Sequence, residues 1–176
     1  MDVYFLRHAN AGESLRDARA DEKRPLDQLG IEQSQRMGRV LAALGVKIDA
    51  IISSPLVRAK QTAALIAPEI GYTKSVLLDK ALRPQASFEE FKEILHRHAK
   101  SESILVVGHN PNQSEFLSLL VSDEATGETI ELKKGGLAKL EWKPRRSYLS
   151  WILTPKLVQT IEEASATSSR PKTSRK

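Results

Sequence analysis

The 176-residue sequence has no cysteine, few aromatic residues and no long hydrophobic run. Without cysteine, disulfide scaffolds, cysteine-based zinc sites and cysteine nucleophiles are all excluded. No run of about 18 apolar residues occurs, so the sequence predicts neither a membrane-spanning helix nor a membrane partner. The first residues show neither the charged segment nor the long apolar stretch of a signal peptide. Together with the lack of thiols, this leads us to expect a cytoplasmic protein.

A formal net charge of +5 invites a nucleic-acid interpretation, but most of the surplus lies at one end of the chain. No acidic residue follows Glu163, and the last residues hold four positive charges, at Arg170, Lys172, Arg175 and Lys176, which leaves +1 for residues 1–163. Aromatic residues form only 5% of the chain and show no regular spacing. We therefore expect no nucleic-acid partner, and a solvated, disordered basic tail from about residue 164.

Strand-like and helix-like patterns alternate along the rest of the chain. Apolar, β-prone runs predict strands at residues 3–6, 48–52, 76–78 and 104–107, and a late hairpin at residues 137–142 and 148–153. Caps and periodicity predict helices at residues 27–44, 55–68 and 87–99, and one that begins at Asn110-Pro111. Residues 9–26 lack periodicity and are interpreted as a loop. The alternation predicts an α/β fold with a mostly parallel sheet and helices on both faces.

Charged and polar side chains follow three of the predicted strands. Arg7 and His8 end the first strand, Arg58 lies one turn into the helix after the second, and His109 follows the strand at residues 104–107. Taken singly, each has an ordinary structural explanation, such as a surface charge or a helix cap. Open α/β sheets bind ligands beyond the carboxyl ends of their strands, where helix N-termini suit phosphate. The shared position therefore predicts one phosphate site.

Three sequence blocks carry a resemblance to a known family. They are Leu6-Arg7-His8-Ala9, the run from Ser53-Ser54-Pro55 through Arg58 to Ala63, and Val107-Gly108-His109-Asn110-Pro111. In order and spacing they resemble the histidine phosphatase superfamily, also called phosphoglycerate mutase-like, and within it the SixA-type phosphohistidine phosphatases. The resemblance covers about residues 1–157. It implies a three-layer α/β/α sandwich, with residues 158–176 as a C-terminal extension.

The resemblance also implies roles for the four residues. His8 matches the nucleophile that becomes phosphorylated, while Arg7, Arg58 and His109 match the positions that hold the phosphoryl group. The implied activity is hydrolysis of protein N-phosphohistidine, in phosphorelay or phosphotransfer signalling. A metal-independent phosphatase of small phosphometabolites or sugar phosphates is the alternative. We expect no metal or other cofactor, because no cluster of acidic residues accompanies the motifs.

Two departures from the family pattern bear on this expectation. Ala9 stands where the family usually has glycine, which is compatible only with an ordinary, negative φ. Many members of the family have a glutamate that serves as general acid in the stretch after residue 78, and this sequence has none there. Asp79 lies upstream of the position where that glutamate is expected. Glu13, Asp17 or Asp21 could supply a proton instead. A phosphomonoester needs such an acid more than phosphohistidine does, because a protonated imidazole departs readily near neutral pH.

Overall fold

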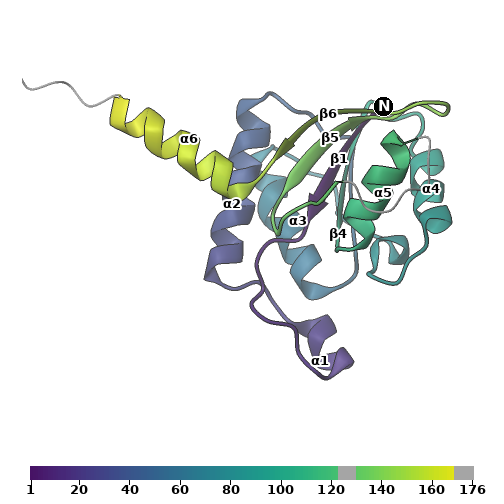
Figure 1. The fold of residues 1–176 in the computed structure, drawn as a ribbon, viewed down its shortest axis with the longest axis horizontal. Helices are drawn as coiled ribbons and strands as arrows, with labels where there is room; N and C mark the ends of the chain where they lie inside the picture. The colour runs from purple at the N-terminus through teal and green to yellow at the C-terminus, as the bar shows by residue number, and fades with distance from the viewer. Residues whose placement is uncertain (123–129, 169–176) are drawn as a thin grey trace, which may run out of the picture.

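The computed structural model describes residues 1–122 and 130–168, and its core is a six-stranded sheet. The sheet has the order β3-β2-β4-β1-β5-β6 (Figure 1). Its strands are β1 (Asp2–Arg7), β2 (Ala50–Ser53), β3 (Leu77–Leu78), β4 (Ser103–Gly108), β5 (Leu137–Glu141) and β6 (Tyr148–Leu153). The helices are α1 (Ala18–Lys23), α2 (Gln28–Ala43), α3 (Val57–Glu69), the 3-10 turn η1 (Lys80–Leu82), α4 (Phe88–Arg97), α5 (Asn112–Val121) and α6 (Pro155–Ser168).

The strand pairings confirm the mostly parallel sheet. Strands β1 and β2 both pair in parallel with β4, and β3 pairs in parallel with β2. Strand β5 runs opposite to the other five strands of the sheet, pairing antiparallel with β1 and with β6. The predicted late hairpin is therefore formed by β5 and β6, and it closes one edge of the sheet.

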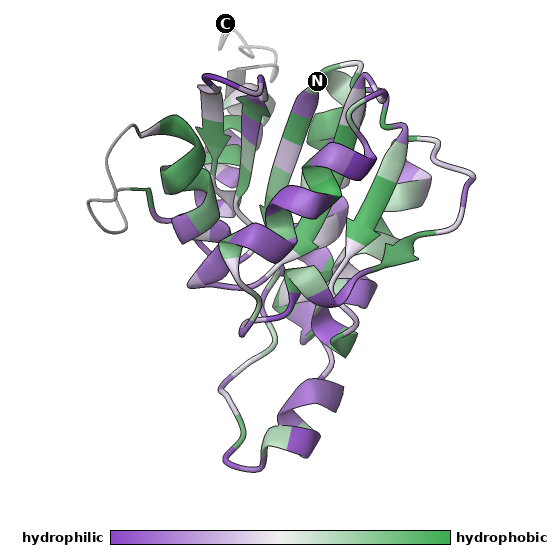
Figure 2. Cartoon of the chain, turned by 90° about the vertical axis from the view of Figure 1, so that its right-hand side faces the viewer, coloured by the Kyte–Doolittle hydropathy of each residue, from purple (hydrophilic) through white to green (hydrophobic). Residues whose placement is uncertain are grey.

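Helices cover both faces of the sheet, as the alternation predicts. Because successive side chains of a strand point to opposite faces, Val3 and Phe5 of β1 join one core cluster, whereas Tyr4 and Leu6 join the other. The first cluster lies under α4 and α5, and the second lies under α2 and α3. Figure 2 shows the apolar strands enclosed between helices with polar outer surfaces. The result is the expected three-layer sandwich.

Helix starts agree with the sequence where a side chain caps the helix. The side chain of Asp27 accepts a hydrogen bond from Gly30 N at 2.8 Å, and Ser87 forms a complete capping box with Glu90. The two starts that pair a cap with a proline lie later than predicted. Helix α3 begins at Val57, and α5 begins at Asn112 because the Asn110 side chain donates to Leu132 O at 3.0 Å instead of capping.

Two segments expected to be irregular contain helix. Residues 9–26 include α1, whose first turn is capped by Asp17, with Oδ1 2.7 Å from Ala20 N. Helix α6 crosses the predicted boundary at residue 157 and extends to Ser168, so residues 164–168 are not irregular. Its contact with α2, which includes the Arg36–Glu162 ion pair at 2.8 Å, is a tertiary interaction that periodicity does not reveal. The remainder of the predicted tail lies outside the described residues. No helix within the described ranges is long and apolar enough to cross a membrane.

Gly30 allows the loop after β1 to lie directly against α2. A Cβ atom at this position would lie 1.9 Å from the carbonyl oxygen of Asn10. We predict that Gly30→Ala lowers the free energy of unfolding by about 1–3 kcal/mol, because backbone has to move. Urea denaturation measures the effect. Ala42→Gly, at an exposed position of the same helix, is the matched control and tests helix propensity alone, which favours alanine by about 1 kcal/mol. A stabilised Gly30→Ala protein would contradict this packing.

Candidate functional site

The carboxyl ends of β1, β2 and β4 meet at the centre of the sheet. In the parallel register Arg7 lies opposite Gly108, and Ser53 lies opposite Val107, so the next residues of the three strands extend to the same edge. The rings of His8 and His109 have centroids 4.9 Å apart. Arg58 reaches them from the first turn of α3. His8, Arg58 and His109 are 6%, 5% and 2% exposed, so the site lies largely beneath the surface.

Hydrogen bonds determine the tautomer of His8. Its Nδ1 lies 2.8 Å from the carbonyl oxygen of Ala9, and a carbonyl can only accept, so Nδ1 carries the proton. Its Nε2 accepts a hydrogen bond from Nε of Arg58 at 3.3 Å. The lone pair of Nε2 is thus directed toward the guanidinium group of Arg58. This is the tautomer and the orientation that a nitrogen nucleophile requires.

The surroundings keep His8 neutral. Burial disfavours the charged imidazolium and lowers the pKa of His8 to about 3. The Ala9 carbonyl opposes this shift, while the positive charges of Arg58, Arg7 and Arg24 add to it. His8 therefore holds an available lone pair throughout the neutral pH range.

His109 is a second neutral histidine beside the first. Burial, followed by the proximity of His8 and of the two arginines, lowers its pKa to about 2. Its Nε2 lies 2.8 Å from Oγ of Ser54, the residue directly after β2. Its Nδ1 is buried and has no hydrogen-bond partner among the described residues. A polar ring nitrogen is thus left for a ligand oxygen.

The two predicted arginines approach the histidines from different elements. Arg7 donates from Nη1 to the carbonyl oxygen of Leu132 at 2.9 Å, and its charge acts on both histidine pKa values. Arg58 donates from Nη1 to the carbonyl oxygen of Asp21 at 2.8 Å, and the same nitrogen lies 3.3 Å from Oδ2 of Asp21. Two planar guanidinium groups at one place suit a phosphoryl group, whose oxygens match their forked donors.

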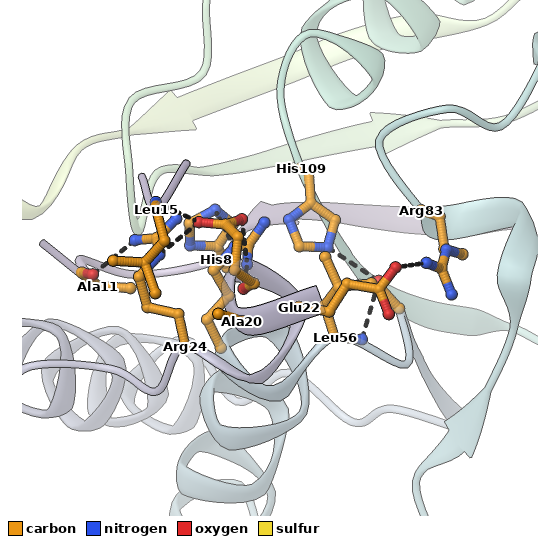
Figure 3. A network of polar contacts seen from close by, with 12 residues as sticks. His8, Ala11, Leu15, Ala20, Glu22, Arg24, Leu56, Arg83 and His109 are labelled. Carbon is orange, nitrogen blue, oxygen red and sulfur yellow. Dashed lines mark hydrogen bonds and ion pairs between the residues drawn. The ribbon is translucent and has the colours of Figure 1, made fainter. Parts of the chain in front are cut away.

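Helix α1 borders the site with charged side chains (Figure 3). Asp21 pairs with Arg58 and, at 2.8 Å, with Arg24, whose Nη1 also donates to Ala11 O. Glu22 forms an ion pair with Arg83, which follows η1. Sequence reasoning missed Glu22, Arg24 and Arg83 as neighbours of the site, because their segments carry no periodic signal and meet it only through the tertiary structure.

Of Glu13, Asp17 and Asp21, the three expected alternatives for a proton donor, only Asp21 contacts a residue of the site. Asp17 caps α1, Asp79 caps η1 and pairs with Arg97, and Glu13 is exposed. Burial raises the pKa of Asp21, but the Leu15 N–H, Arg24 and Arg58 outweigh it and hold that pKa below its ordinary value. Asp21 is therefore a carboxylate at neutral pH, with no proton to give.

The backbone around the site accommodates Ala9 and brings a glycine-containing segment close to His8. Among the described residues no amino acid other than glycine has positive φ, so Ala9 is accommodated in place of the family's glycine. Ala9 is fully buried, and its N–H donates to Oγ1 of Thr62 at 3.2 Å. The segment of residues 133–136 lies beside the site: Gly135, with φ of +69°, donates to the carbonyl oxygens of Arg7 and His8, both at 3.1 Å.

The described part of the chain contains no group of three or more histidine, cysteine, aspartate or glutamate residues arranged to hold a metal ion. What the site offers is a neutral imidazole whose lone pair accepts a hydrogen bond from Arg58, with the charge of Arg7 acting on the same ring. A nucleophile surrounded by fixed positive charge at the carboxyl ends of parallel strands is suited to phosphoryl transfer.

Comparisons with known proteins agree with this class of chemistry. The family model described as "Histidine phosphatase superfamily (branch 1)" matches residues 3–87. An uncharacterized protein of Picosynechococcus sp. PCC 7002 is 33% identical over 143 residues, covering 80% of this chain and 84% of its own. The phosphohistidine phosphatase SixA of Escherichia coli K12 is 28% identical over 131 residues, covering 73% and 77%. The chain belongs to the histidine phosphatase superfamily, and it is a phosphatase.

Solved structures share the fold. The protein histidine phosphatase SixA complexed with tungstate aligns with a TM-score of 0.76 at 24% identity, covering 89% of this chain and 98% of that one. The alpha-ribazole phosphatase of Shigella flexneri aligns with a TM-score of 0.71 at 17% identity, covering 88% and 97%. The same sandwich is thus found in phosphatases with different names, and it does not by itself determine the substrate.

We predict that His8 stays neutral in the free enzyme from pH 7.5 down to 5. In ¹⁵N-histidine-labelled protein without phosphate, two-bond ¹H–¹⁵N spectra should show the Nδ1–H form of His8 across this range. The pKa near 3 places its protonation below the titration range. His8→Ala assigns the signal. A midpoint near 6.5, the ordinary value for histidine, would contradict the structure.

Proposed function

We propose that the protein is a phosphohistidine phosphatase that hydrolyses protein N-phosphohistidine through a phospho-His8 intermediate. The observation that carries this proposal is the fixed tautomer of His8. With Nδ1 donating to Ala9 and the lone pair on Nε2 beside Arg58, His8 is oriented for attack before substrate arrives. Preorganised groups of this kind lower a barrier because little has to move during reaction.

The reaction proceeds in two balanced steps. Nε2 of His8 attacks phosphorus and a new P–N bond forms. The P–N bond of the substrate, whose imidazole solvent has protonated on the other ring nitrogen, breaks to release a neutral imidazole that keeps the electron pair of that bond. Water then attacks phospho-His8, which yields inorganic phosphate and restores neutral His8. In both steps the guanidinium groups of Arg7 and Arg58 stabilise the equatorial oxygens, and Nδ1 of His109 supplies a further polar contact.

The carboxylates of the site favour phosphohistidine over an alkyl phosphomonoester. An alkoxide leaving group needs a proton from a general acid, and such acids contribute about 10²–10⁴-fold to a rate. Asp21, the carboxylate beside Arg58, is ionised by its basic neighbours and cannot act in this way at neutral pH. An imidazole can accept its proton from solvent before it leaves. The site therefore suits the P–N bond better than the P–O bond.

The proposal places the protein in phosphorelay or phosphotransfer signalling, where phosphohistidine proteins occur. Its similarity to the phosphohistidine phosphatase SixA of E. coli supports the same substrate class. The alternative is a metal-independent phosphatase of small phosphometabolites or sugar phosphates. The observation that favours this alternative is the fold that the chain shares with the alpha-ribazole phosphatase.

Replacing the nucleophile is expected to abolish turnover without loss of the fold. We predict that His8→Ala lowers kcat on phosphohistidine by at least about 10³-fold, because the covalent route is lost. The matched control is His98→Ala at the end of α4, which should keep wild-type turnover. Rapid acid-free quenching and mass spectrometry should find phosphate on His8 in the wild-type protein. Undiminished activity of His8→Ala would disprove the assigned nucleophile.

Substrates whose leaving groups differ in their need for a proton distinguish the two candidate substrate classes. We predict that kcat/KM for phosphohistidine exceeds that for alkyl monoesters such as phosphoserine or a sugar phosphate by at least about 100-fold, the share a missing general acid would supply. An aryl phosphate with a nitrophenolate leaving group is the matched control, since it departs without a proton, and it should be hydrolysed well. Comparable values for phosphohistidine and alkyl monoesters would favour the small-metabolite alternative.

A further inference from the structure

A groove lies next to the site, between the loop after β1, helix α2 and the start of α6. It has a volume of about 530 Å³. Its lining includes Asn10, Leu29, Lys133, Lys134, Pro155 and Lys156. None of these residues takes part in the proposed reaction, although Asn10 lies only two residues after His8.

The groove is joined rigidly to the site. Nζ of Lys134 donates to Oδ1 of Asn10 at 3.1 Å, and the N–H of Asn10 donates to Oε1 of Gln33 on α2 at 3.0 Å. The adjoining Gly135 donates to the carbonyl oxygen of His8. A surface seated in the groove would therefore be held at a fixed distance from the nucleophile.

The chemistry of the lining is apolar with a positive border. Leu29 is 51% exposed and lies with Pro155 in the lining, so the groove offers an accessible apolar surface. No acidic side chain is among the residues that line the groove. Lys156 has no ion pair among the described residues, and Lys133 pairs only with Glu131 in a contact where both side chains are 60% exposed. Such an exposed pair is weak and can be exchanged for another acid.

A protein substrate would bring its surface close to this groove, because Asn10 of the lining lies only two residues after His8. The reacting ring of phosphohistidine is attached to its backbone by a single methylene group, so the surface around the ring comes close to His8 with it. We propose that the groove docks the protein that carries the phosphohistidine, through an apolar side chain seated on Leu29 and acidic side chains facing Lys133 and Lys156. This inference rests on the proposed function and adds a preference for acidic partners.

Two synthetic phosphohistidine peptides test the preference. Both carry leucine near the phosphohistidine, and they differ only in having glutamate or lysine at the flanking positions. For wild-type protein at low salt we expect kcat/KM to be about tenfold higher for the acidic peptide, through KM, and the difference to shrink as salt is added. Free phosphohistidine, which cannot reach the groove, is the reference substrate.

Substitutions in the groove should change kcat/KM for the peptides and leave kcat/KM for free phosphohistidine unchanged. We expect the double variant Lys133→Glu with Lys156→Glu, and separately Leu29→Asp, to remove the preference for the acidic peptide while leaving kcat/KM for free phosphohistidine unchanged. The matched control is Lys47→Glu with Lys100→Glu, a pair of exposed lysines that precede β2 and β4 at the opposite end of the sheet. It makes the same change in net charge and should retain the preference.

The outcomes separate the docking inference from the proposed function. A preference for the acidic peptide that survives in the double variant, or is lost equally in the control pair, would overturn the docking groove. So would a wild-type dimer in sedimentation that Leu29→Asp converts to monomer, since a second copy would then cover the groove. If wild-type protein hydrolyses neither peptide nor free phosphohistidine, the proposed function fails, and the docking inference falls with it.

Discussion

The parallel pairing of β1 with β4, in which Arg7 lies opposite Gly108, is the contact on which the site depends. This register brings the residues that follow, His8 and His109, to ring centroids 4.9 Å apart, although they are distant in the sequence. Strand β2 pairs with the other side of β4, so the helix after it delivers Arg58 to the same place. Both core clusters hold this arrangement by burying the alternate faces of β1.

Burial lowers the pKa of the site histidines and of Arg58 alike, but only the histidines are neutral at neutral pH, because arginine starts from a far higher pKa. Desolvation pushes the imidazoles toward their neutral forms, and the guanidinium charges add to that push. A guanidinium group is not deprotonated in proteins, and here carbonyl oxygens and the Asp21 carboxylate accept hydrogen bonds from the two arginines. A neutral nucleophile can therefore coexist with fixed positive charge, a combination that an exposed histidine with an ordinary pKa would lack at slightly acidic pH.

The border of the site is where members of a shared fold can differ. The sandwich and the strand ends place His8, His109 and the two arginines, whose proposed roles would be the same for any phosphoryl substrate. What surrounds them here is α1 on one side and the lysine-bordered groove on the other. These segments are loops and helix ends, whose composition can change without disturbing the core. Differences in substrate choice between members of this fold are therefore expected to lie in such border segments and not in the sheet.

The sequence by itself determined the layers, most element positions and the four central residues, because capping, alternation and strand ends are local signals. Caps with a direct side-chain hydrogen bond, at Asp27 and Ser87, were placed correctly. Helices α1 and α6 were not predicted; α6 is held by contacts with distant residues, such as that of Glu162 with Arg36. Only the tertiary structure decided the tautomer of His8, the ionised state of Asp21 and the place of residues 133–136. Each depends on which distant groups share one desolvated space, and that information exists only once the strands have paired.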